Sequence, residues 1–257
     1  MALGVILFFC NIVKAQDNQH YQEFEGFKKL GFSASVLSNR KTVFDNFDRS
    51  YSLKPNNSIS YSFGFDYVFN PTKEYTFRTG LFITSIPLFN FEVSIPQENN
   101  PANFNNDFQE NIKSGSNLVF SIPVFYELKK QLDKKVFFSA IAGLNFAILF
   151  DGEISTSIVL TDTDNDNSFE VFGSYALSND FPIYPNLVLR PGLYFTGKNI
   201  IFHASFIYHK AIVPYFEGEY QFGNLVDAEP IRDNLKITGD YIGLGLTVYL
   251  KKRRPNR

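Results

Sequence analysis

The stretch DYIGLGLTVYL, residues 240–250, decides the fold class of this chain. Every second residue is aliphatic in the order Ile242, Leu244, Leu246, Val248, Leu250. The residues between them are glycine, threonine and tyrosine. Because strand side chains alternate between two faces, this period of two predicts a strand with one apolar face and one small, polar face. The apolar face must meet either a protein core or lipid.

The same alternation recurs along the chain. Seven further segments carry it: 30–36, 58–69, 75–83, 117–128, 135–150, 186–195 and 200–209. In the second of these, Tyr61, Phe63 and Phe65 share a face, with serine, glycine and Asp66 opposite. Prolines at 123 and 191 weaken two of the predicted strands, because proline donates no ladder hydrogen bond.

The connections between these segments alternate in length. Short turns lie at 70–74, 129–135 and 196–199, whereas the other four connections run roughly 15 to 30 residues. Outer-membrane barrels combine short periplasmic turns with longer extracellular loops. We therefore predict an all-β fold, a closed antiparallel up-and-down transmembrane β-barrel of about eight strands.

The N-terminus predicts export. Residues 1–15 contain the apolar run GVILFFCNIV, and Val13 and Ala15 have the spacing of a signal-peptide cleavage site before Gln16. The expected organisation is a signal peptide at 1–15, a periplasmic segment at 16–28, the barrel at 29–250 and a basic periplasmic tail at 251–257. The expected location is the cell outer membrane.

The composition of the chain limits the classes of partner and cofactor that we expect it to bind. The net charge of −2 gives no electrostatic footprint for nucleic acid, so the expected partners are outer-membrane lipid and an envelope protein that contacts the loops. The single cysteine excludes an internal disulfide framework. No cofactor motif is present, and none is expected.

The two faces of the predicted strands assign individual residues. The expected lipid-facing residues include Tyr61, Phe63, Phe65, Leu244, Leu246 and Val248. The expected luminal polar plug comprises Asp66, Arg78, Glu127, Arg190 and His203. A turn centred on Thr72 would place Asp66 directly opposite Arg78, so that opposite charges meet. Because an eight-stranded lumen is only wide enough for side chains, a plug is favoured over a narrow pore.

Two patterns imitate functional sites. Asp162, Asp164, Asp166, Ser168 and Glu170 alternate like the start of a calcium loop. Asn167 replaces the glycine of the sharp turn and Gly173 replaces the bidentate acid, so a solvated acidic loop is favoured and no metal is expected.

His203 and Ser205 share a strand face and resemble the His-x-Ser motif of lipid A deacylase barrels. They follow the short turn at 196–199, which is the wrong side for chemistry at the outer leaflet, and no acid is assigned to orient the histidine. No catalytic residue is therefore expected.

The strands LVFSIPVFYEL, FFSAIAGLNFAILF and YIGLGLTVYLKK, with the signal ending KAQ, resemble the PorT-like outer-membrane barrel family. The resemblance implies the barrel fold and an outer-membrane location, and by analogy a role in envelope assembly or secretion.

The expected function is a non-enzymatic anchor that displays loops, or an envelope component. The alternatives are a secreted lipocalin-like barrel that binds a small hydrophobic ligand, and a barrel-embedded lipid A hydrolase. Loops at about 38–57, 96–115, 151–181 and 223–239 would carry recognition. Their aromatic residues Phe104, Phe108, Phe169 and Phe172 would make contacts or cap the barrel mouth.

Overall fold

The computed structural model describes eight stretches of the chain. They are residues 21–39, 42–44, 52–102, 106–113, 115–150, 152–162, 166–178 and 181–252. The predicted signal peptide and most of the basic tail lie outside the described residues. Among the described residues, no helix has the length and hydropathy needed to cross a bilayer.

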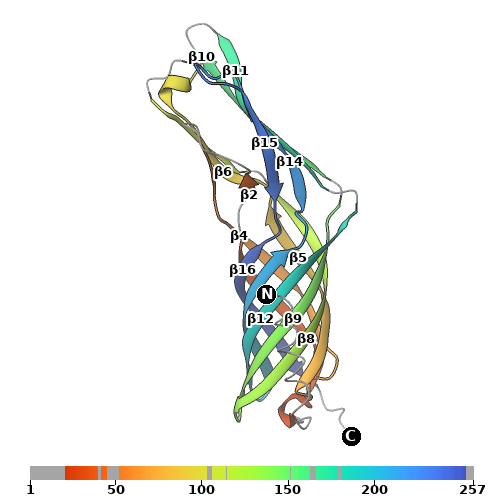
Figure 1. The fold of residues 1–257 in the computed structure, drawn as a ribbon. Coiled ribbons are helices and arrows are strands. Elements are labelled where there is room, and N and C mark those ends of the chain that lie inside the picture. The colour runs from red at the N-terminus through yellow and green to blue at the C-terminus, as the bar shows by residue number, and fades with distance from the viewer. Residues whose placement is uncertain are drawn as a thin grey trace, which may run out of the picture.

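Eight strands form a closed antiparallel barrel, which confirms the predicted fold class (Figure 1). In order around the barrel they are β1 (Phe27–Asn39), β16 (Tyr241–Lys251), β13 (Ile200–Ala211), β12 (Ile183–Thr196), β9 (Val136–Ile148), β8 (Ser116–Asp133), β5 (Tyr75–Pro87) and β4 (Ser58–Val68). Pairing of β1 with β16 closes the sheet. The stretch at residues 240–250 therefore forms the strand that closes the barrel.

The two prolines lie inside the barrel wall, and each interrupts one ladder. The β5–β8 pairing skips from Thr79↔Val124 to Phe82↔Ser121, around Pro123. The β12–β13 pairing skips from Leu189↔Tyr208 to Gly192↔Ser205, around Pro191. Both prolines remain in register with β9 on their other side. Each strand thus accommodates the missing N–H by opening one side only.

Glycine allows close approach of neighbouring strands inside the barrel. A Cβ atom added to Gly64 in β4 would lie 2.3 Å from the carbonyl oxygen of Leu81 in β5 and 2.7 Å from the ring of Phe82. A larger residue would therefore push the two strands apart.

Short and long connections alternate as predicted. The short ones are 69–74, 134–135 and 197–199. The stretch 129–135, predicted as a turn, is mostly strand, because β8 continues to Asp133.

The long connections contain strands that the sequence analysis did not predict. They form two further sheets beyond one end of the barrel (Figure 1). One has the order β10 (Glu153–Asp162), β11 (Asn167–Ser178), β14 (Phe216–Phe222), β15 (Ile231–Ile237) and β2 (Thr42–Phe44). The other has the order β3 (Ser52–Pro55), β6 (Asn90–Ile95) and β7 (Phe108–Lys113). The 3-10 helices are η1 (Gln22–Phe24) and η2 (Gln97–Asn99).

The two sheets enclose an apolar core, which explains why these segments are ordered. Phe91 of β6 is fully buried, and its ring contacts Phe44 of β2 and Phe172 of β11 at centroid distances of 5.2 and 5.7 Å. The same core reaches Ile86 and Ala147 in the barrel strands. We call this two-sheet unit the β-sandwich. Hydrophobic side chains that were predicted to lie in loops therefore form the core between two packed sheets.

Candidate functional site

The outer surface of the barrel is apolar all round. Exposed large apolar residues on the eight strands include Leu30, Phe32, Ile59, Tyr61, Phe63, Phe65, Phe77, Leu81, Leu118, Val124, Phe138, Leu187, Leu189, Phe202, Phe206, Leu244 and Leu246. Of the six residues predicted to face lipid, Leu244 is 68% exposed and Val248 is half-buried by its neighbours. All six point away from the lumen, because the residues alternating with them are the buried ones.

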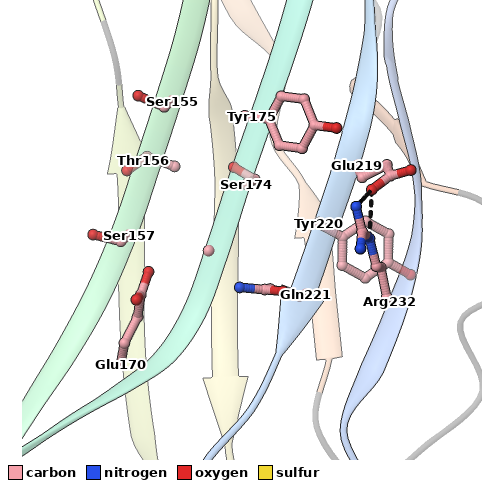
Figure 2. Close-up of a pocket in the computed structure, with 11 residues that line it drawn as sticks. Ser155, Thr156, Ser157, Glu170, Ser174, Tyr175, Glu219, Tyr220, Gln221 and Arg232 are labelled. Atoms are coloured by element: carbon pink, nitrogen blue, oxygen red, sulfur yellow. Dashed lines mark hydrogen bonds and ion pairs between the residues drawn. The ribbon is translucent and has the colours of Figure 1, made fainter.

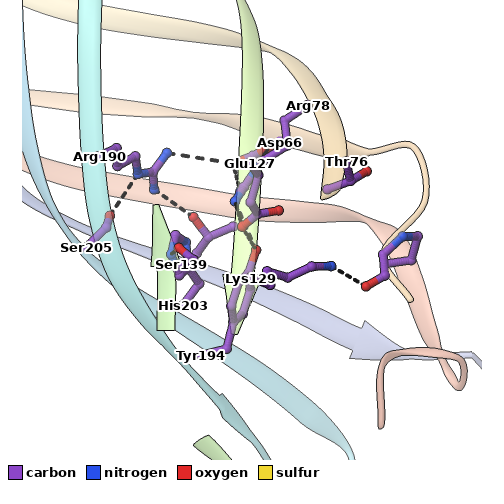
Figure 3. A network of polar contacts seen from close by, with 12 residues as sticks. Asp66, Thr76, Arg78, Glu127, Lys129, Ser139, Arg190, Tyr194, His203 and Ser205 are labelled. Atoms are coloured by element: carbon purple, nitrogen blue, oxygen red, sulfur yellow. Dashed lines mark hydrogen bonds and ion pairs between the residues drawn. The ribbon is translucent and has the colours of Figure 1, made fainter. Parts of the chain in front are cut away.

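Arg78 is the centre of a buried polar network inside the barrel (Figure 3). Its Nε donates to Asp66 Oδ1 at 3.2 Å, and its Nη2 also contacts the second carboxylate oxygen. Its Nη1 donates to Glu127 Oε1 and to the hydroxyl of Tyr194, each at 2.9 Å. Its Nη2 donates to the hydroxyl of Tyr249 at 2.7 Å. One guanidinium from β5 therefore joins two carboxylates and two phenols from four other strands.

Arg190 supplies the second positive charge. Its Nη1 lies 3.7 Å from Asp66 Oδ2, its Nε donates to Ser205 Oγ at 2.8 Å, and its Nη2 donates to Thr247 Oγ1 at 3.0 Å. Two arginines thus face Asp66 and Glu127, and the formal charges cancel. The structure brings four of the five predicted plug residues into this one network.

The predicted centre of the β4–β5 turn, Thr72, is wrong by one residue. Asp66 lies opposite Gly80, and Arg78 lies opposite Val68. The turn is therefore centred on Lys73. The long arginine side chain reaches diagonally along the pair, so the charges still meet.

His203, the fifth predicted plug residue, is buried beside the network. Its Nε2 lies 2.8 Å from Ser139 Oγ, and its ring stacks on Tyr194 at a centroid distance of 4.2 Å. Ser205 instead accepts from Arg190 and donates to the carbonyl of Gly245. The two side chains of the His-x-Ser pattern therefore have different hydrogen-bond partners, and neither lies at the surface.

An N-terminal cap covers the barrel end that carries the short turns. Its residues are Tyr21 and Phe24, whose rings pack edge-on against Phe137 at centroid distances of 5.2 and 5.0 Å. Lys129 lies 4.7 Å from the Phe24 ring and donates to the carbonyl of Pro71. The backbone N–H of Tyr21 donates to the carbonyl of Thr72 at 2.7 Å. The cap closes this end.

Two hollows among the described residues of the barrel are small. One of about 40 Å³ is lined by residues that include Ser35, Thr84 and Arg190, and one of about 10 Å³ lies beneath the cap. Ligand pockets usually measure about 300–1,000 Å³. These two hollows therefore offer space for a water molecule and not for a lipocalin-type ligand.

Three buried polar residues were not predicted: Tyr194 and Tyr249 of the network, and Lys129, which contacts the cap. Both tyrosines occupy alternate positions on the same face as Arg190 or Thr247, which is the signal that could have found them. Lys129 was assigned to a turn, and only the extension of β8 shows that it points inward.

The acidic run does not assemble a metal site in the described part of the chain. Asp162 ends β10 opposite Asn167, and Asp164 lies outside the described residues. No group of three or more His, Cys, Asp or Glu side chains there could hold a metal ion. Of the predicted contact aromatics, Phe172 is buried in the β-sandwich core, Phe108 and Phe169 pack against it, and Phe104 lies outside the described residues.

Comparison with known proteins finds a similar chain among solved structures and no match among protein families or curated proteins. No protein-family model and no curated protein matches the sequence. Among solved structures, the chain is similar to the outer membrane protein OprG from Pseudomonas aeruginosa, with 10% sequence identity and a TM-score of 0.35 over 87% of this chain and 94% of that one. These comparisons show no family for the chain.

Proposed function

We propose that this chain is a non-enzymatic outer-membrane β-barrel that anchors the β-sandwich at the cell surface. The observation that carries the proposal is the inverted arrangement of the barrel, with an apolar belt outside and cancelled charges inside.

The apolar belt supports a lipid environment. Monomeric soluble proteins rarely expose a contiguous apolar patch of more than a few hundred Å². Here every strand of a closed barrel contributes large apolar side chains. The strands contain 11 to 18 residues, and a tilted transmembrane strand needs about 9–11. Closure of the barrel leaves no sheet edge to be satisfied in hydrocarbon.

The connections support an orientation. The short turns, the start of β1 and the end of β16 lie at the same end of the barrel. In outer-membrane barrels this end is periplasmic. The signal-peptide pattern agrees with this orientation. The β-sandwich would then lie outside the cell.

The filled lumen favours an anchor over a pore, a ligand carrier or an enzyme. Arg78, Arg190 and their partners occupy the cross-section, and the N-terminal cap covers one end. A lipocalin-like carrier would need an apolar interior, and a lipid A hydrolase would need the His203–Ser205 pair to be accessible. The likeness to PorT-like barrels agrees with an envelope protein as partner of the β-sandwich.

Cell fractionation tests the location. We expect the protein in the outer-membrane fraction, with a gel mobility that changes on boiling because the closed barrel resists detergent at room temperature. Protease added to intact cells should cut within the β-sandwich and leave the barrel strands protected. A soluble product without the mobility change would refute the membrane assignment. Steady single-channel conductance in planar bilayers would refute the plugged lumen.

A further inference from the structure

The outer face of the five-stranded sheet carries a polar groove. It has a volume of about 520 Å³ and is lined by residues from four neighbouring strands, β10, β11, β14 and β15 (Figure 2). This volume falls within the range of about 300–1,000 Å³ that small-molecule sites occupy. The groove lies on the face turned away from the β-sandwich core, because the alternating residues of β14, such as Tyr220 and Phe222, are buried in that core.

Gly173 lies in the middle of the groove. The strand register aligns Ser157, Gly173, Gln221 and Arg232 in one row across the sheet. Three of these residues carry polar side chains, and the glycine carries none, so the Glu170 carboxylate and the Gln221 amide come close to its backbone. A Cβ atom at Gly173 would meet first the Glu170 carboxylate at 3.1 Å and then the Gln221 amide nitrogen at 3.6 Å. The groove thus lies where a glycine interrupts a row of polar side chains.

The next row supplies an aromatic wall. Ser155, Tyr175 and Glu219 are aligned there, and the Tyr175 side chain is 41% exposed. Glu219 accepts a hydrogen bond from Arg232 Nε, which fixes both side chains at the rim. The hydrogen bond to Glu219 raises the pKa of Arg232, so its guanidinium stays charged.

A second hollow of about 320 Å³ continues the groove. It shares Glu170, Gly173, Gln221 and Arg232 with the first and extends along the strands to Asn224. The binding surface is therefore elongated and fits a chain-like ligand better than a compact one.

We propose that this groove binds a neutral oligosaccharide chain. The two serine hydroxyls, the Gln221 amide and the Glu170 carboxylate offer donors and acceptors to sugar hydroxyls. The half-exposed Tyr175 ring offers an apolar face to the C–H groups of a pyranose. Glu170 forms no ion pair among the described residues, so the lining carries one excess negative charge and disfavours an acidic ligand.

An extended peptide fits the groove less well. Peptides that bind sheets in extended form add to an edge strand through main-chain hydrogen bonds. The groove lies on the sheet face, where the main chains of β11 and β14 are already paired with each other. Only side chains are available to a ligand there, which suits the many hydroxyl groups of a sugar.

Calorimetric titration of the purified full chain tests the proposal. The protein is held in lauryldimethylamine oxide, since maltoside or glucoside detergents would compete as sugars. The probes are maltopentaose, cellopentaose, mannopentaose and chitopentaose, with oligogalacturonate as the acidic probe and a neutral Ser/Thr-rich peptide as the extended-chain probe. We expect saturable binding of at least one neutral sugar with a Kd below about 10 mM.

Variants locate the site. Gly173→Leu should fill the groove and Tyr175→Ala should remove the wall, each weakening binding at least about tenfold. Thr161→Ala, on the same hairpin and outside the groove, should bind like the unmodified protein. Gly173 does not have a positive φ, and its nearest neighbour is a flexible carboxylate, so the leucine can be accommodated. Gln221→Ala provides a second test if that variant fails to fold.

Three outcomes would overturn the proposal. They are no binding of any neutral sugar, binding that survives the groove variants, and tighter binding of oligogalacturonate or the peptide. Heat-dependent gel mobility of every variant shows separately whether the barrel is closed, so failure of the sugar site and failure of the membrane proposal are distinguishable.

Discussion

Replacing Arg78 by methionine should destabilise the barrel severely, because two carboxylates depend on one guanidinium. In Arg78→Met, Asp66 keeps Arg190 at 3.7 Å, whereas Glu127 loses its ion pair and keeps the hydrogen bond from the Tyr194 hydroxyl at 2.7 Å. Breaking a buried ion pair by removing one partner costs about 3–5 kcal/mol. With a urea m-value of about 2 kcal/mol per molar, the unfolding midpoint should fall by about 1.5–2.5 M.

A second substitution sharpens this prediction. Adding Glu127→Gln to Arg78→Met should restore most of the lost stability, since a neutral amide can still accept from Tyr194 and no unpaired charge remains. Adding Asp66→Asn instead should restore less, because it removes the partner of Arg190 and leaves Glu127 charged.

The assay is equilibrium urea unfolding of the protein in lipid vesicles, with the folded fraction measured from gel mobility without boiling. Lys210→Met is the matched control. Its ion pair with Asp240 is exposed, with 52% of the lysine side chain accessible, and should contribute only about 0–1 kcal/mol. An Arg78→Met midpoint equal to that of Lys210→Met would refute the reasoning, as would equal rescue by the two second substitutions.

Three further predictions test other parts of the molecule. Leu246→Arg places a charge on the apolar belt and should cost about 2–4 kcal/mol in vesicles by the same urea assay, and no loss would contradict lipid contact. Gly64→Val should prevent barrel closure, seen as no heat-dependent gel shift, because its side chain would overlap the Leu81 carbonyl. Phe91→Ala should cost the β-sandwich about 3–5 kcal/mol and expose it to protease while the gel shift persists, and loss of the shift would mean that the two units unfold together.

The barrel was predictable from the sequence because its code is local. In segment 58–69 each residue faces either outside or lumen, and the contrast between aromatic residues and serine or glycine shows which. The short turns are equally local. The eight-stranded closed fold follows from repetition of these two signals.

The β-sandwich was not predictable in the same way. β3 and β2 contain only four and three residues, too few to display a period. Their partners are β6 and β15, which come from other connections. In the lumen, the charged residues could be assigned from strand faces, but the role of Tyr249 depended on a hydrogen bond to Arg78, 171 positions earlier in the chain.

The pairing of β2 with β15 links Thr42 to Ile237, so a strand of the first long connection completes a sheet whose other strands come from the third and fourth. The barrel is closed by an equally distant pair, β1 and β16. Long-range pairing is slow, because the entropy of loop closure is lost before the contact forms. Pairing of Asn39 with Tyr241 leaves only a short loop to close between Thr42 and Ile237, so the outer sheet should be completed after the barrel wall has closed. A chain that stalls during insertion would therefore lack a complete five-stranded sheet. A complete five-stranded sheet would be present only on a barrel that has closed.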